Sequence, residues 1–193
     1  MKRPVAVALV AMMFAVVSCK RGEQAVSGYS DPATTTNATT QASVSTDTAA
    51  KAEVGTPMPE YAAVYLDGSK FDLATKRDKI VLLNVWATWC GPCRFEIPEL
   101  QQLHEKYAPR GLEVVGVSVD ESGVDSVRSF VAEQKKLTYP IVLDAEGKIA
   151  NILQTTVLPT SIVVDRKGQI VWKRYGAIME GDEELKKAIE AAL

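Results

Sequence analysis

The stretch Trp86-Ala87-Thr88-Trp89-Cys90-Gly91-Pro92-Cys93 decides the fold, because it joins a predicted strand to a predicted helix. Residues 80–85 before it are apolar except for Asn84, which is typical of a central strand covered on both faces. An apolar helical face follows the stretch, at Phe95, Leu100, Leu103 and Tyr107. This spacing predicts a helix from Cys93 to Tyr107, with both cysteines at its start.

The Cys90-Gly91-Pro92-Cys93 spacing favours redox chemistry between the two sulfurs. A cysteine at a helix N-terminus faces unpaired backbone N–H groups and the positive end of the helix dipole, and both favour the thiolate. Arg94 adds a positive charge beside them. A zinc knuckle would need two more ligands, and haem attachment would need histidine where Arg94 stands. A static structural disulfide is the remaining alternative.

Outward from this motif, strand and helix patterns alternate along the chain. The predicted elements after the first helix are a strand at 112–119, a helix at 124–136, a strand at 141–143, a helix at 149–154, a hairpin at 161–175 and a helix at 183–193. Before the motif, residues 61–73 predict a hairpin around Asp67-Gly68. This order predicts an α/β fold with a mixed central sheet flanked by helices and an N-terminal β-hairpin extension.

Several segments together resemble the TlpA/ResA-like family of exported thiol–disulfide oxidoreductases, which belongs to the thioredoxin superfamily. Trp89-Cys90-Gly91-Pro92-Cys93 is the thioredoxin motif, and the wider likeness lies in residues 56–61, 83–90, 96–100, 115–120, 158–160 and 164–168. The resemblance spans residues 56–193 and implies a thioredoxin-like fold. Asn84 departs from thioredoxin itself, where a buried Asp stands. TlpA/ResA-like proteins instead place an acidic residue three positions after the second cysteine, which here is Glu96.

The expected catalytic residues are Cys90, Cys93 and Glu96. Cys90 is expected to be the exposed, attacking sulfur and Cys93 the shielded one. Glu96 lies one helical turn beyond Cys93, on the side of the sulfurs. We expect it to be buried, with a pKa raised by desolvation and like-charge repulsion, and to exchange a proton with Cys93. The alternative is that Glu96 only favours the first helical turn through the dipole.

The resemblance also implies a substrate-binding surface around the dithiol. Pro159 is expected to be a cis proline that lies against the disulfide and exposes backbone for a substrate strand; the alternative is a trans proline at a strand edge. The substrate-binding residues implied are Trp89, Gly91, Pro92, Leu158 and Pro159. Trp86 is expected in the core and Trp89 at the rim of the site. His104 is expected on the helix surface, away from the chemistry.

The N-terminus has the pattern of an export signal. Lys2 and Arg3 precede an apolar run, Val5 to Val17, which as a helix would span about 20 Å, too short for a bilayer core of roughly 30 Å. The run ends at Val16-Val17-Ser18-Cys19, which resembles a bacterial lipobox and implies lipidation of Cys19. The alternative is a secreted protein with Cys19 as a bystander.

The predicted organisation has three parts. Residues 1–18 form a signal peptide, residues 19–55 a lipidated N-terminus and flexible linker, and residues 56–193 a thioredoxin-like domain. The linker is rich in Thr, Ser and Ala and poor in large apolar side chains, so it cannot bury enough surface to order itself. The alternative is a partner-recognition segment that folds on binding.

Composition limits the possible partners. The net charge of −2 gives no sign of a nucleic-acid binder, and a single histidine beside three cysteines argues against a zinc site. We expect no metal and no cofactor. The odd cysteine count leaves Cys90 and Cys93 as a working pair once Cys19 is lipidated.

These observations predict an extracytoplasmic, membrane-anchored protein-disulfide reductase on the periplasmic side of the cell envelope. The family implies disulfide-containing clients such as apocytochrome c, and a membrane electron donor of CcdA or DsbD type. One alternative is a peroxiredoxin-like peroxidase, although Thr88 stands only two residues before Cys90 and no matching proline precedes it. Another is a Sco-like copper-binding assembly protein, although CxxxC and a downstream ligand His are both missing.

Overall fold

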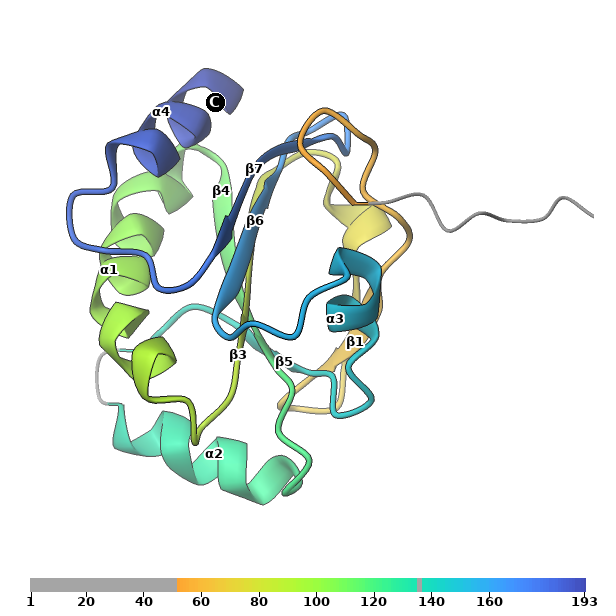
Figure 1. Ribbon diagram of the computed structural model, residues 1–193, viewed down its shortest axis with the longest axis vertical. Coiled ribbons are helices and arrows are strands. Elements are labelled where there is room, and N and C mark those ends of the chain that lie inside the picture. Colours follow the sequence, from red (N-terminus) through yellow and green to blue (C-terminus); the bar gives the residue numbers. More distant parts are fainter. Residues whose placement is uncertain (1–51, 135–136) are drawn as a thin grey trace, which may run out of the picture. The chain divides into compact units, whose positions relative to one another are not determined.

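The structure, a computed structural model, describes residues 52–134 and 137–193, which form one mixed sheet with helices around it (Figure 1). The strands are β1 (Ala62–Tyr65), β2 (Lys70–Asp72), β3 (Ile80–Trp86), β4 (Leu112–Ser118), β5 (Ile141–Leu143), β6 (Thr160–Val164) and β7 (Ile170–Tyr175). The helices are α1 (Gly91–Tyr107), α2 (Val124–Glu133), α3 (Lys148–Leu153) and α4 (Glu183–Ala192), with short 3-10 turns η1 (Leu73–Lys76) and η2 (Ala108–Arg110). The predicted α/β fold, mixed sheet and N-terminal hairpin are confirmed.

The strands follow the order β2-β1-β5-β4-β3-β6-β7 across the sheet. β3 runs parallel to β4 and antiparallel to β6, and every residue of all three strands is buried. Continuous apolar runs are what strands covered on both faces require. The carboxyl ends of β3 and β4 therefore meet the amino end of β6 at one edge of the sheet.

Alternation along β3 divides the core between the two faces of the sheet. Ile80 and Leu82 belong to one apolar cluster, whereas Val81, Leu83 and Val85 belong to another. Successive side chains of a strand point to opposite faces, so each cluster fills one face. The first cluster includes side chains of α1 and α4, and the second includes side chains of α3 and the hairpin, which Figure 1 shows on opposite sides of the sheet.

Helix α1 differs from its prediction at its start and on one face. It begins at Gly91, two residues before the predicted start, because Cys90 is its N-cap. Phe95, which was predicted to join the apolar face, is instead 86% exposed. A helix turns by about 100° per residue, so Phe95 lies about 140° around the axis from the fully buried Leu100.

Helix α2 is shorter than predicted. It ends at Glu133, where the backbone N–H of Gln134 donates to the carbonyls of Phe130 and Val131. The remainder of the predicted helix includes residues 135 and 136, which lie outside the described residues. In the described ranges, no helix combines the length and apolar content needed to cross a membrane.

The chain joins the sheet before β1. Ala52 is fully buried, and the backbone N–H of Gly55 donates to the carbonyl of Ile170, at 2.8 Å. The ammonium of Lys173 donates to the carbonyl of Ala52, also at 2.8 Å. The described chain is therefore already packed against the domain at Ala52. The predicted signal peptide and Cys19 lie outside the described residues.

Candidate active site

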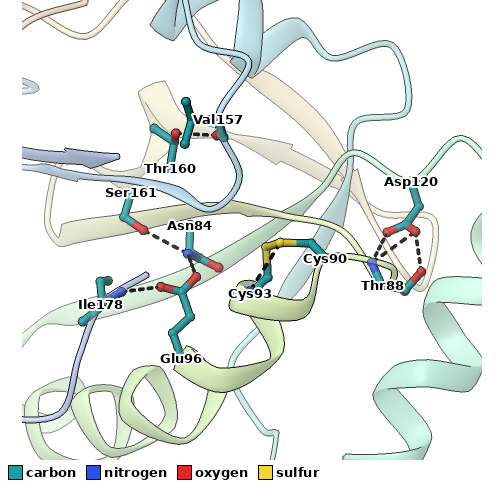
Figure 2. Close-up of a disulfide and its surroundings, with 10 residues drawn as sticks. All are labelled: Asn84, Thr88, Cys90, Cys93, Glu96, Asp120, Val157, Thr160, Ser161 and Ile178. Atoms are coloured by element: carbon teal, nitrogen blue, oxygen red, sulfur yellow. Dashed lines mark hydrogen bonds between the residues drawn. A yellow bond between two sulfur atoms is a disulfide. The ribbon is translucent and has the colours of Figure 1, made fainter. Parts of the chain in front are cut away.

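The two cysteines lie where β3 passes into α1, and they form a disulfide with a Cα–Cα distance of 5.3 Å (Figure 2). The Cys90 sulfur accepts a hydrogen bond from the backbone N–H of Cys93, at 3.3 Å, so it occupies the N-cap position of the helix. A thiolate at this position is stabilised by the same N–H group and by the helix dipole. Cys90 was expected to be exposed, but in this disulfide-bonded structure both residues are buried, with Cys90 5% and Cys93 1% exposed.

Glu96 lies one turn further along α1 and is 1% exposed. Its Oε1 accepts from the side-chain amide of Asn84 at 2.7 Å, and its Oε2 accepts from the backbone N–H of Ile178 at 2.8 Å (Figure 2). Burial raises the pKa of Glu96 from 4.5 to about 7, and these two hydrogen bonds limit the rise because they favour the carboxylate. The expected burial and raised pKa are both present. Desolvation is the main cause, and the oxidised pair carries no thiolate to repel the carboxylate.

Asn84 connects the CxxC helix with the strand after Pro159. Its amide nitrogen donates to Glu96 and also to the hydroxyl of Ser161, at 2.9 Å, and all three side chains are buried. Sequence interpretation noticed Asn84 as an exception in an apolar strand and as a departure from the buried Asp of thioredoxin, but it did not foresee Ser161. A polar residue inside a buried strand requires a partner, and that requirement is the signal that could have revealed the network.

The Leu158–Pro159 bond is cis, as the family resemblance implies. The strand register pairs Val85 with Thr160, so Pro159 lies at the edge of the sheet where β3 leads to Cys90. The hydroxyl of Thr160 donates to the carbonyl of Val157 at 2.7 Å and so links the residues on either side of Leu158 and Pro159. Pro159 is buried and Leu158 is half-buried, and Leu158 packs against the cluster that contains both cysteines.

The other residues expected to bind substrate form the rim. Trp89 is 70% exposed, and Gly91 and Pro92 are exposed beside it. Trp86 is 3% exposed and lies in the core, as expected. The structure therefore brings Trp89, Gly91 and Pro92 together at the surface next to the disulfide.

Asp120 anchors the loop between β3 and Cys90. Its carboxylate accepts from the backbone N–H of Thr88, at 3.0 Å to Oδ2, and from the Thr88 hydroxyl, at 2.5 Å (Figure 2). It also accepts from the Ser118 hydroxyl, at 2.8 Å. Because β3 and β4 are parallel and end side by side, residues just beyond their carboxyl ends meet. Sequence interpretation assigned no role to Asp120.

Two side chains of α1 have contacts that the sequence did not predict. The guanidinium of Arg94 lies 5.6 Å from the centre of the Phe130 ring, on α2. His104 was expected on the surface but is half-buried, with its ring centroid 6.3 Å from that of Tyr139. It is not part of the site, as expected.

The described residues give no support to the alternative chemistries. Within residues 52–134 and 137–193, no three His, Cys, Asp or Glu side chains gather as a metal site would require. The hydroxyl of Thr88, the residue considered for peroxidase chemistry, is bonded to Asp120. Cys19, the predicted lipidation site, is not among the described residues.

The fold and the paired cysteines define the class: a thioredoxin-fold protein with a CxxC pair at the N-terminus of its first long helix. Residues 54–173 match the AhpC/TSA family. A thiol-disulfide oxidoreductase ResA from Bacillus cereus is 34% identical over 143 residues, which are 74% of this chain and 78% of that protein.

Solved structures agree with this relationship. A DsbF homologue from Corynebacterium diphtheriae is 32% identical, with a TM-score of 0.62 over 70% of this chain and 85% of that one. A secreted thiol-disulfide isomerase from Corynebacterium glutamicum is 28% identical, with a TM-score of 0.60 over 70% of this chain and 83% of that one. The chain belongs to the ResA/TlpA-like thiol–disulfide oxidoreductases of the AhpC/TSA family, and it is an enzyme of that class.

Proposed function

We propose that this oxidoreductase works as a reductase of protein disulfides outside the cytosol. The observation that carries the proposal is the Cys90–Cys93 pair at the start of α1, with the buried acid Glu96 one turn beyond it. A sulfur held at a helix N-terminus is a good nucleophile and a good leaving group, because its thiolate is stabilised there.

In the proposed reaction the Cys90 thiolate attacks one sulfur of a client disulfide. A Cys90–client disulfide forms, and the second client sulfur leaves as a thiolate and takes a proton. The Cys93 thiolate then attacks the Cys90 sulfur, which breaks the mixed disulfide and forms the Cys90–Cys93 bond. The client leaves as a dithiol, and the two electrons it gains are those that the enzyme loses.

Glu96 is proposed to handle the proton of Cys93. A carboxyl with a pKa of about 7 is divided between its two protonation states near neutral pH, so it can both accept and return a proton. As a base it would take the Cys93 proton before Cys93 attacks. Its hydrogen bonds to Asn84 and Ile178 would keep the carboxyl in place through the cycle.

The substrate surface and cellular setting extend the proposal. Trp89, Gly91, Pro92, Leu158 and Pro159 would receive an extended client segment beside the disulfide. The secreted relative from C. glutamicum supports an extracytoplasmic location, and the lipobox-like sequence supports anchoring through Cys19. The proposed organisation is a signal peptide at 1–18, a lipidated linker at 19–55 and the catalytic domain at 56–193.

The partners follow from the family resemblance. Thiols outside the cytosol tend to be oxidised, so a reductase there needs a supply of electrons. A membrane donor of CcdA or DsbD type would provide them, and apocytochrome c before haem attachment is the client proposed first.

The direct test is to trap clients in cells with Cys93→Ser. Because the variant keeps the attacking Cys90 and lacks the resolving sulfur, it should accumulate mixed disulfides with clients. These adducts appear on a non-reducing gel and disappear when reductant is added. Cys90→Ser is the matched control and should accumulate none. Equal yields from the two variants, or no adducts from either, would exclude the proposed reaction.

A further inference from the structure

A groove runs beside the proposed active site, between α1 and the segment that connects β7 to α4. Its cavity has a volume of about 340 Å³ and is lined by Phe95, Pro98, Glu99, Gln102, Ala177, Ile178, Met179 and Glu180. Phe95 is 86% exposed and Met179 is 68% exposed, so two large apolar side chains face solvent at one groove. A second cavity of about 220 Å³ continues from it and shares Glu99, Gln102 and Glu180.

Glu99 is the unusual residue of this groove. It is 7% exposed, yet its carboxylate makes no side-chain hydrogen bond or ion pair with any residue in the described parts of the chain. Its carboxylate oxygens are nevertheless not buried from solvent, so a cation bound beside them in the groove can form an ion pair with Glu99. Its position on the wall of both cavities leaves it open to an occupant of the groove.

The other charges of the groove are consistent with a cationic occupant. Glu180 is exposed and lines both cavities with Glu99. Lys106 and Lys186 line only the second cavity, so the first cavity, which Phe95 and Met179 line, has two carboxylates and no basic side chain in its lining.

We propose that this groove binds an extended segment of the client polypeptide that carries an apolar side chain and a Lys or Arg two residues apart. Phe95 and Met179 would contact the apolar side chain, and Glu99 with Glu180 would pair with the cation. Phe95 and Glu99 are four residues apart on α1, which places them on one face about 6 Å apart along the axis. An extended chain advances about 3.3 Å per residue, so side chains two residues apart match that spacing and point to the same side.

The groove is connected to the redox site through its wall. The backbone N–H of Ile178 donates to Glu96, so the segment that forms one side of the groove is held by the acid next to Cys93. Phe95 is two residues from Cys93 along the helix. A client segment in the groove would therefore lie a few residues from the client sulfur under attack. This inference rests on the proposed client reduction and specifies which clients are preferred.

The test measures selectivity between peptides with stopped-flow kinetics on the reduced enzyme. Each short peptide carries one cysteine in a disulfide with a chromogenic aryl thiol. The sequence Phe-x-Lys, Phe-x-Glu or Ser-x-Lys stands before the cysteine in one set of peptides and after it in a second set. Ratios of rate constants between peptides are compared, so any change in the intrinsic reactivity of the dithiol cancels. The wild type should prefer Phe-x-Lys over each of the other two, on at least one side, by roughly tenfold.

Two variants should separate the two contributions. Glu99→Gln keeps the shape of the side chain and should lose the preference for Lys over Glu while keeping that for Phe over Ser. Phe95→Ser should lose the preference for Phe over Ser while keeping that for Lys over Glu. Val64→Ser, at an exposed position on β1, is the matched control and should keep both preferences. Wild-type ratios below twofold on both sides, or equal loss of both preferences in both variants, would overturn the proposal.

A binding measurement keeps this inference distinct from the proposed reaction. Peptides with Ser in place of Cys are titrated into the oxidised full-length protein by calorimetry, where no exchange occurs. The same order of affinities supports the groove even if the enzyme fails to reduce proteins. Equal affinities for all three peptides overturn the groove even if the enzyme proves to be a reductase.

Discussion

Replacing Glu96 with Gln should change how the stability of the oxidised protein depends on pH. Burial raises the pKa of Glu96 to about 7 in the folded state, against 4.5 for an exposed carboxyl. Between these two values the unfolded chain has released the proton while the folded protein still holds it. Stability from this group is therefore fully present below pH 4.5 and is lost as the pH rises through 7.

The size of the effect follows from the two pKa values. Each pH unit between them corresponds to about 1.4 kcal/mol, so the ionised carboxylate costs the folded state about 3 kcal/mol above pH 7. Glu96→Gln removes this pH-dependent cost. The variant also loses one hydrogen-bond acceptor, because its amide nitrogen must face either Asn84 or Ile178, but that penalty is the same at every pH.

Urea unfolding of both proteins without reductant, from below pH 4.5 to above pH 7, measures the difference directly. The free energy of unfolding of the variant minus that of wild type should increase by about 3 kcal/mol across this range, whatever its starting value. Glu121→Gln, at an exposed position, is the control, and its free energy of unfolding should change with pH as that of wild type does. If the Glu96→Gln curve also runs parallel, Glu96 does not have a raised pKa and its proposed part in proton exchange fails.

Three further outcomes are expected. Asp120→Ala should lower the free energy of unfolding in urea by about 2–3 kcal/mol, because it leaves the Thr88 N–H without its acceptor. Thr88→Val removes one hydroxyl and should lower it by about 1 kcal/mol. Equal losses in the two variants would contradict this account. Leu100→Ala should cost about 2–5 kcal/mol by the same measurement, since Leu100 is fully buried, and a loss below 1 kcal/mol would mean that α1 is not packed as described. Cys19→Ser should move the protein from the membrane to the soluble fraction with exchange on small disulfides unchanged; a wild-type protein already in the soluble fraction would refute the lipid anchor.

The sequence predicted the order of elements well because most of the strands are continuous apolar runs and the helices have clear apolar faces. It failed where geometry around a helix axis decides exposure. Phe95 is apolar and lies in a predicted helix, but its angular position places it on the outer side of α1. The end of α2 was placed too late, because the pattern from Val124 onward contains no glycine or proline to mark the last turn.

For the candidate site, the sequence predicted those features that are determined by residues close together in the chain. The CxxC spacing, the helix start and the position of Glu96 all follow from residues close together in the chain. The contacts of Asn84 with Ser161 and of Glu96 with Ile178 join residues more than seventy positions apart. The register of β3 with β6 brings the first pair together, and the segment after β7 brings Ile178 to α1. The cis bond at Pro159 came from family resemblance, because no local pattern distinguishes it.

The docking of Gly55 against Ile170 has a practical consequence for handling the protein. Ile170 pairs with Val164, and Val164 pairs with Val81 near the amino end of β3. Cys90 follows the carboxyl end of β3, which lies about 16 Å further along the strand. The segment from Ala52 also packs with the α3 side, away from the face that α1 covers. An affinity tag or a biotin attached ahead of Ala52 should therefore leave the disulfide open, so immobilised enzyme can be used to capture clients from solution.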